Sequence, residues 1–375
     1  MTQEFEALHV NITWELVPLP VEKQVIGCKW VYKVKHKADG SIVRFKAKLV
    51  VKGYTQQTEI DYTETFSPMV KITTVRALIA AAVKKGWDIF QLDMNNAFCH
   101  GDLHEEVYIE VPQGLVVDSG HMTCKLKKSL YGLKQASRQW YAKMIVILTG
   151  TNKEEIEELK AFLHENFKTK DLGKFHYFLG PEIFYKADGV VISQRKFVLD
   201  LLKEYNCMDY SSLASPLDSI VKLKAKEGTT LTDPTYYRKL VGKLNFLTNT
   251  RIDIAYSVQY LSQLMQDPRE PYLKAAFHLL RYLKGDLSMG IFMSHDPNCN
   301  IRAYCYSDWA VCPDSRKSVS DYLILLGNSP ICWKSKKQET ISLSSVEAEY
   351  RALRKVVGEG CADFLKSSLC PLVNQ

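Results

Sequence analysis

An acidic residue stands near the end of a strongly apolar segment in the first third of the chain. Residues 89–98 read IFQLDMNNAF, so that Asp93 closes a buried strand and a polar turn follows. Carboxylates at strand ends are ligands for divalent cations in many folds. The same pattern also fits an aspartate that only caps the turn after the strand. The segment alone favours the cap, and the rest of the chain decides between the two interpretations.

The composition is that of an ordinary globular protein with a modest basic excess. The chain has 375 residues, of which 46% are hydrophobic and 24% charged, and its net charge is +7. This length is sufficient for two or three cores. The ten cysteines include no CxxC pair, a pattern that favours reduced thiols over a zinc site or a disulfide framework. Residues 1–17 lack the apolar core of a signal peptide, and no apolar run is long enough for a membrane span. We therefore expect an intracellular protein, cytoplasmic or nuclear, that is not secreted and has no membrane partner.

A basic hairpin is predicted near the N-terminus. Residues 29–35 and 42–52 alternate polar with apolar side chains, and the Asp-Gly pair in residues 38–41 favours a tight turn. Four basic residues lie along the second strand: Arg44, Lys46, Lys48 and Lys52. They could form a solvated edge that discourages aggregation, or they could bind phosphates. The hairpin by itself supports both interpretations equally.

A second basic stretch contains aromatic residues. Residues 124–143 carry six lysines and arginines together with Tyr131, Trp140 and Tyr141, and no acid occurs between Asp118 and Glu154. Phosphate contacts from basic side chains combined with aromatic stacking are typical of a nucleic-acid groove. The alternative is an amphipathic helix with a solvated basic face.

Apolar periodicity predicts the main secondary structure elements. Helices are predicted at residues 73–85, 153–167, 236–247, 253–265 and 272–284, and further strands at 107–112, 301–310, 322–328 and 331–338. A last helix is predicted to begin near Ser345, as its N-cap.

Five motifs together resemble one family. They are KWVYK (29–33), KAKLVVKGYTQ (46–56), FSPMV (66–70), LDMNNAF (92–98) and SLYGLKQA (129–136). They occur in the order found in the Pol polyprotein of copia-type LTR retrotransposons, and they look like its reverse transcriptase and ribonuclease H segment. The resemblance extends over nearly the whole chain.

This resemblance implies a fold and a domain order. The fold would be α+β, a right-hand polymerase followed by a ribonuclease H-like α/β domain. Fingers and palm would occupy residues 1–212, with later palm strands at 171–180 and 189–197, and a helical thumb or connection would occupy 234–295. The residues between them, 213–233, are rich in Lys, Ser and Thr and lack aromatic residues, so they are predicted to be a linker. Residues 296–375 would be the ribonuclease H-like domain, C-terminally truncated relative to the family.

The resemblance also implies site residues and partners. Asp93 would be the first metal-binding aspartate of the palm, and Mg²⁺ would be the cofactor. Template-primer of RNA and DNA would contact the fingers, and the expected binding residues are Arg44, Lys46, Lys48, Lys52, Tyr131, Gly132, Lys134, Gln135 and Arg138. A homodimer is conceivable by family analogy, but no residue of the sequence argues for one, so the oligomeric state is open.

The sequence departs from the family where catalysis requires more carboxylates. Two-metal phosphoryl transfer needs several acids around both ions, and the family supplies them from a later Tyr-Val-Asp-Asp hairpin. Here residue 143 is followed directly by MIVILTG (144–150), and no Asp-Asp pair lies between Asp93 and Asp171. We expect an internal deletion near residue 144, either real or produced by a gene model that skipped coding sequence. We also expect the strand of Asp93 to lose a neighbour, which would leave buried polar groups unpaired at about 1–3 kcal/mol each.

The ribonuclease H-like segment departs from its family as well. Glu349 matches the helix glutamate of that family and Asp308 its second acid, but Tyr306 stands where the first aspartate is expected. Asp93, Asp308 and Glu349 are therefore predicted to be vestigial catalytic residues.

Three hypotheses follow from these observations. The first is an RNA-directed DNA polymerase by descent, with a ribonuclease H-like region, that is catalytically inactive and so a pseudoenzyme. The second is a non-enzymatic nucleic-acid-binding remnant. The third is a decaying element whose product folds poorly and has no molecular role.

Overall fold

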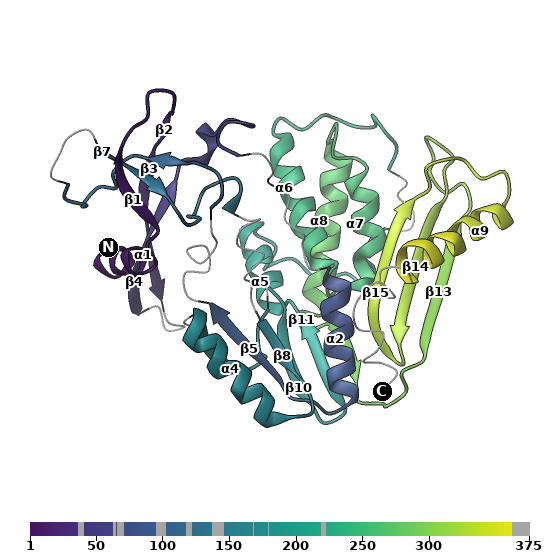
Figure 1. The fold of residues 1–375 in the computed structure, drawn as a ribbon. Coiled ribbons are helices and arrows are strands. Elements are labelled where there is room, and N and C mark those ends of the chain that lie inside the picture. Colours follow the sequence, from purple (N-terminus) through teal and green to yellow (C-terminus); the bar gives the residue numbers. More distant parts are fainter. Residues whose placement is uncertain are drawn as a thin grey trace. The chain divides into compact units, whose positions relative to one another are not determined.

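The structure, a computed structural model, is a mixed arrangement of helices and strands (Figure 1). It describes residues 1–36, 41–62, 65, 71–94, 103–117, 122–136, 146–167, 169–178, 180–218 and 223–361. The chain forms two compact units. Unit 1 comprises Met1–Met69, Phe90–Leu148 and Asn152–Gly173, and unit 2 comprises Val70–Ile89, Thr149–Thr151 and Lys174–Gln375. None of the described helices is both long and apolar enough to cross a lipid bilayer.

A small sheet and a long hairpin form the first part of unit 1. The sheet has the order β1-β7-β6-β2, with β1 (Trp14–Pro18), β2 (Val25–Ile26), β6 (Tyr108–Ile109) and β7 (Met122–Leu126). The hairpin consists of β3 (Cys28–His36) and β4 (Ile42–Val51), paired antiparallel as the alternation predicted. Leu8 of α1 (Thr2–Val10), Leu49 and Leu130 belong to one buried cluster with the sheet. This core holds β4 against the segment that follows β7.

The strand that carries Asp93 lies in the middle of a second sheet. The order is β8-β5-β9, with β8 (Val146–Thr149), β5 (Ile89–Met94) and β9 (Thr169–Lys174). Leu92, Leu148 and Ile156 of α4 (Lys153–Phe167) form its buried core. The expectation that β5 would lack a neighbour was wrong, because the chain after residue 145 supplies β8 as a pairing strand.

Unit 2 contains an antiparallel sheet and a helical core. The sheet has the order β10-β11-β12, formed by β10 (Glu182–Lys186), β11 (Gly189–Ser193) and β12 (Gly290–Ser294). The strand predicted at 189–197 ends at Ser193, and helix α5 (Arg195–Glu204) takes over. The other helices are α2 (Ile72–Lys84), α6 (Pro234–Leu247), α7 (Ala255–Ser262) and α8 (Glu270–Gly285), and a 3₁₀ turn, η3 (Ile252–Ile254), precedes α7.

One buried cluster joins α5 to the three helices α6, α7 and α8. It includes Leu202 of α5, Leu240 of α6 and Leu280 of α8, and also Leu223, which comes from the stretch expected to be a linker. The apolar stripes read from the sequence therefore pack into a single core. The domain boundaries given above stay a prediction.

The C-terminal part of unit 2 is an antiparallel sheet with one packed helix. Its order is β13-β14-β15, with β13 (Ile301–Asp308), β14 (Val319–Leu326) and β15 (Ser329–Lys337). Helix α9 (Ser345–Lys355) packs on β13 and β14 and continues into the π-helical turn η4 (Val356–Cys361). The N-cap of α9 is Ser344, whose side chain accepts a hydrogen bond from the Glu347 amide, and not Ser345 as predicted.

Candidate nucleic-acid and metal sites

The basic face of β4 is the first candidate site, and it lies in unit 1. Arg44 is exposed and Lys46 half-buried. Burial lowers the pKa of Lys46, the neighbouring charges of Lys48 and Arg44 lower it further, and Glu4 and Asp93 act in the opposite direction. Like charges placed this closely need counter-ions, so the face is suited to polyanions. The charge of Asp93 thus acts on Lys46, a residue of the hairpin.

Lys48 is engaged within the protein. Its ammonium lies 3.5 Å from a carboxylate oxygen of Glu4 and 4.4 Å above the ring centre of Tyr131. These contacts seat the hairpin on the segment that follows β7. The same contacts partly neutralise Lys48, whereas Lys46 lies opposite Lys33 of β3 and shares a basic face with it.

A close backbone approach joins β4 to that segment. The amide of Val51 donates to the carbonyl of Tyr131 at 2.7 Å. A Cβ on Gly132, where φ is +95°, would lie 2.1 Å from the Val51 oxygen, and one on Gly53 would lie 2.0 Å from the Gly132 oxygen. Both glycines are required here because the two backbones are in contact.

Side-chain hydrogen bonds complete this junction. Gln135 is fully buried; its amide oxygen accepts from Gln56 at 3.1 Å, and its amide nitrogen donates to the Asp61 carbonyl at 3.1 Å. The ammonium of Lys134 donates to the Gln56 carbonyl at 2.9 Å and to the Tyr62 hydroxyl at 3.2 Å. Two of the predicted binding residues, Lys134 and Gln135, therefore hold the turn in place. Lys52 begins the 3₁₀ turn η1 (Gly53–Thr55) as its N-cap, and Arg138 lies outside the described residues.

Asp93 is exposed near the end of β5. Within the described ranges, no group of three or more acidic, histidine or cysteine side chains is arranged to hold a metal ion. A single carboxylate in the field of Lys46 does not match the donor set that a pair of Mg²⁺ ions requires. The residues described around Asp93 therefore do not fit the cofactor that the resemblance implies.

Acidic residues gather around Tyr306 in the C-terminal sheet. The Tyr306 hydroxyl donates to Asp308 at 2.8 Å, and Asp321 lies directly opposite Tyr306 on β14. The hydrogen bond to Asp308 and the charge of that carboxylate raise the pKa of Tyr306, and Glu349 and Asp321 add to the effect. A phenol thus stands among acidic residues, and its hydroxyl occupies one carboxylate oxygen of Asp308.

Glu349 and Asp321 have distinct local roles. One carboxylate oxygen of Glu349 accepts from the Ser307 amide at 3.1 Å, so the side chain ties α9 to β13. Burial raises the pKa of Asp321, and the nearby charge of Asp308 raises it further. Sequence reasoning missed Asp321 because the predicted strand began one residue later, and only the cross-strand register places it beside Tyr306.

Comparison with known proteins identifies the family. The family model described as "Reverse transcriptase (RNA-dependent DNA polymerase)" matches residues 11–149 and 145–219, more than half of the chain. The chain belongs to this reverse transcriptase family. The match comes in two segments that overlap at residues 145–149.

Curated relatives extend the likeness over nearly the whole chain. The Retrovirus-related Pol polyprotein from transposon RE1 of Arabidopsis thaliana is 38% identical over 96% of this chain and 27% of its own length. The corresponding polyprotein from transposon RE2 of the same plant is 37% identical over 96% and 27%. That from transposon TNT 1-94 of Nicotiana tabacum is 36% identical over 94% and 30%. The chain thus corresponds to the reverse transcriptase-like region of copia-type Pol polyproteins. It spans less than a third of the length of each of these relatives.

The alignment with the RE1 polyprotein is longer than the part of this chain that it covers. The alignment runs over 396 positions, whereas 96% of the 375 residues of this chain is about 360. Roughly 36 positions of the alignment therefore hold a residue of the RE1 polyprotein and none of this chain. This difference is large enough to hold a strand, a turn and part of a helix.

Proposed function

We propose that this chain is a reverse transcriptase-derived protein that binds RNA and DNA strands but does not polymerise DNA. Under this proposal the fingers and palm occupy residues 1–212 and the ribonuclease H-like region, which contains β13–β15 and α9, occupies residues 296–375. The observation that carries the proposal is the shortfall of roughly 36 aligned positions, combined with a family match in two segments that overlap at residues 145–149 and with the lack of an Asp-Asp pair between Asp93 and Asp171.

Loss of polymerase chemistry follows from the number of carboxylates. Two divalent ions need several acids to balance their charge and fill their coordination shells. Asp93 is one acid, and its electrostatic neighbour Lys46 carries a positive charge. In the ribonuclease H-like region, the Tyr306 phenol replaces an acid and binds Asp308. Both catalytic centres of the family are incomplete under this proposal.

Retention of nucleic-acid binding is supported by the basic hairpin. Arg44 is exposed and Lys46 is crowded by like charges, so that binding a phosphate backbone would relieve repulsion between them. The junction around Gln56 and Gln135 holds β4 in place, so the basic face is preorganised.

Primer extension tests the absence of polymerisation. The wild type and an Asp93→Ala variant are incubated with an RNA template, a DNA primer, deoxynucleotides and Mg²⁺ or Mn²⁺. We expect no incorporation by the wild type above the level of the variant. Extension that depends on Asp93 would refute the inactive centre, whatever the binding results.

Salt-dependent binding tests the second half of the proposal. We expect the affinity for a labelled RNA–DNA hybrid to fall steeply with salt, because phosphate contacts release counter-ions. Arg44→Ala should reduce the slope of log K against log salt by about one. The matched control is Arg195→Ala, at an exposed arginine of α5 in unit 2. Equal slopes for the two variants would exclude the hairpin as the binding face.

A further inference from the structure

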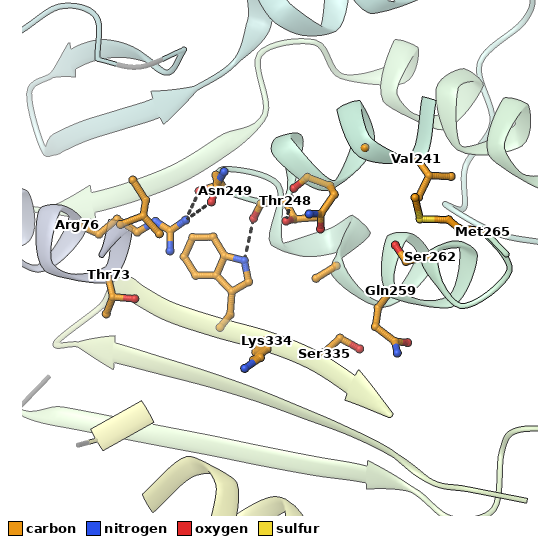
Figure 2. A pocket seen from close by; sticks show the side chains of 15 residues that line it. Thr73, Arg76, Val241, Thr248, Asn249, Gln259, Ser262, Met265, Lys334 and Ser335 are labelled. Carbon is orange, nitrogen blue, oxygen red and sulfur yellow. Dashed lines mark hydrogen bonds between the residues drawn. The ribbon is translucent and has the colours of Figure 1, made fainter. Parts of the chain in front are cut away.

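A cavity of mixed apolar and polar lining within unit 2 lies apart from the sites described above. Its volume is about 510 Å³, and it opens between the first turn of α2, the end of α6, α7 and β15 (Figure 2). Its lining is rich in hydroxyl and amide groups, including Thr73, Asn245, Thr248, Asn249, Gln259 and Ser262. Such groups can donate and accept hydrogen bonds to a ligand inside a lining that also contains apolar side chains.

Arg76 forms one wall of this cavity and is only 6% exposed. One of its terminal nitrogens donates to the Asn249 carbonyl at 2.6 Å and approaches the Asn249 side-chain oxygen at 3.4 Å (Figure 2). The guanidinium lies 3.8 Å from the ring centre of Trp333, whose indole nitrogen donates to the Thr248 carbonyl at 2.9 Å. These contacts fix the guanidinium in one orientation.

Arg76 lacks an acidic partner among the described residues, where no ion pair involves it. The contrast is Arg251, which is 2% exposed and forms an ion pair with Asp253 at 2.7 Å. Burial lowers the pKa of Arg76 to about 10, and no carboxylate opposes the shift. A buried cation without a counter-charge is unfavourable, and a bound anion would remove that penalty.

A second source of positive potential reaches the same cavity. Ile72 and Thr73, the first two residues of α2, line it. Helix α2 has 13 residues, and no side chain caps its N-terminus. The first amides of a helix and its dipole favour anions at this end. The N-terminus of α2 and the Arg76 guanidinium therefore both contribute positive potential to the same cavity.

We propose that this cavity binds a phosphate group, carried either by a nucleic-acid strand or by a free nucleotide. Arg76 would supply the charge and a forked donor set, which matches phosphate geometry. The α2 amides and the hydroxyl and amide groups of the lining would bind the remaining oxygens. This site is independent of the basic hairpin of unit 1 and does not require the proposed function.

The competing explanation is purely structural, in which Arg76 only ties α2 to α6 and to Trp333. Asn249→Asp separates the two, because aspartate has the shape of asparagine and places a carboxylate beside Arg76. If the role is structural, the substitution leaves ligand responses unchanged. If the cavity binds phosphate, the new carboxylate forms an ion pair with Arg76, neutralises its charge and repels the ligand.

Titration calorimetry and thermal unfolding of the full chain test this at constant ionic strength. The probes are inorganic phosphate, a 5′-deoxynucleoside monophosphate and a ten-residue DNA oligonucleotide, with chloride as the reference. The matched control is Asn300→Asp, which makes the same charge change at an exposed residue outside the cavity.

We expect at least one probe to bind the wild type and Asn300→Asp alike, and to bind Asn249→Asp about tenfold or more weakly, the loss expected when a charge-assisted pair is neutralised. Asn249→Asp loses the hydrogen bond that the Asn249 side-chain nitrogen donates to the Phe246 carbonyl at 3.0 Å, so a cooperative unfolding transition without ligand is the measurement that shows the variant is folded. A response to the oligonucleotide alone assigns the phosphate to a strand, and a response to the small probes assigns it to a nucleotide. Binding that is absent in the wild type, or equal in Asn249→Asp, overturns the proposal.

Discussion

The ion pair between the buried Arg251 and the half-buried Asp253, whose side chain is 22% exposed, offers a quantitative test of the helical core of unit 2. The guanidinium of Arg251 binds both oxygens of Asp253 at 2.7–3.2 Å and donates to the Asp286 carbonyl at 2.9 Å. The Tyr282 hydroxyl donates to Asp253 at 2.8 Å. In Asp253→Asn the arginine stays buried and loses its counter-charge. Breaking one side of a buried pair costs about 3–5 kcal/mol, a large share of the roughly 5–15 kcal/mol that stabilises a domain.

Thermal unfolding followed by circular dichroism measures the effect. For a unit of this size, 1 kcal/mol corresponds to roughly 2–4 °C in Tm, so Asp253→Asn should unfold about 6–20 °C below the wild type. Asp267→Asn is the matched control, since Arg269 holds Asp267 with the same two-residue spacing at 2.8 Å, but Asp267 is 53% exposed. An exposed pair contributes at most about 1 kcal/mol.

The outcome decides whether this core is formed as described. Equal Tm values for Asp253→Asn and Asp267→Asn would refute the buried pair, and a broad transition in the wild type would favour the poorly folding product among the original hypotheses. Burial alone would raise the pKa of Asp253, but hydrogen bonds from Arg251 and Tyr282 and the charge of Arg251 lower it on balance. Because the folded-state pKa lies below the unfolded one, the contribution is complete above about pH 4 and is lost as the pH falls through the folded value.

Three further changes have defined outcomes. Gly132→Ala should lower the Tm of unit 1, because a Cβ there meets the Val51 oxygen at 2.1 Å with φ at +95°, whereas Gly242→Ala in α6 meets no atom within 4 Å and should be neutral or stabilising; equal effects in calorimetry would contradict the close approach. Tyr306→Asp should place like charges beside Asp308 and Asp321 and so lower the Tm in metal-free buffer. Added Mn²⁺ should raise the Tm again, and a Tm insensitive to Mn²⁺ would show that the three aspartates of the variant do not bind a metal ion. Burial raises the pKa of Cys312, but the hydrogen bond that the Lys337 ammonium donates to its sulfur at 2.8 Å is a main reason that this pKa falls to about 7. Alkylation of Cys312 should therefore be half-maximal near pH 7 and shift to higher pH in Lys337→Met, and an unshifted profile would show that Lys337 does not set the pKa.

The sequence predicted the elements whose signal is local. Helix α4 begins and ends at the predicted residues 153 and 167, because its apolar positions recur at helical spacing and its first turn is acidic. The predicted helix at 253–265 is instead the short turn η3 followed by α7, which ends at Ser262. Features that depend on register or tertiary packing could not be predicted. The position of Asp321 opposite Tyr306 needs the β13–β14 pairing, and the burial of Arg76 needs α2, α6 and β15 to meet.

The central position of β5 shows why the fold and the proposed loss of chemistry can be separated. The strand is seated by apolar side chains from three elements, Leu92, Leu148 and Ile156. Such burial is non-directional and roughly proportional to area, so a shortened chain can supply it again with a different segment. Metal chemistry has no such tolerance, since it depends on a few carboxylates at fixed positions. A shortened reverse transcriptase can therefore keep the strand that carries Asp93 and still lack the acids that would make Asp93 catalytic, which is why primer extension and thermal unfolding must be measured on the same preparation.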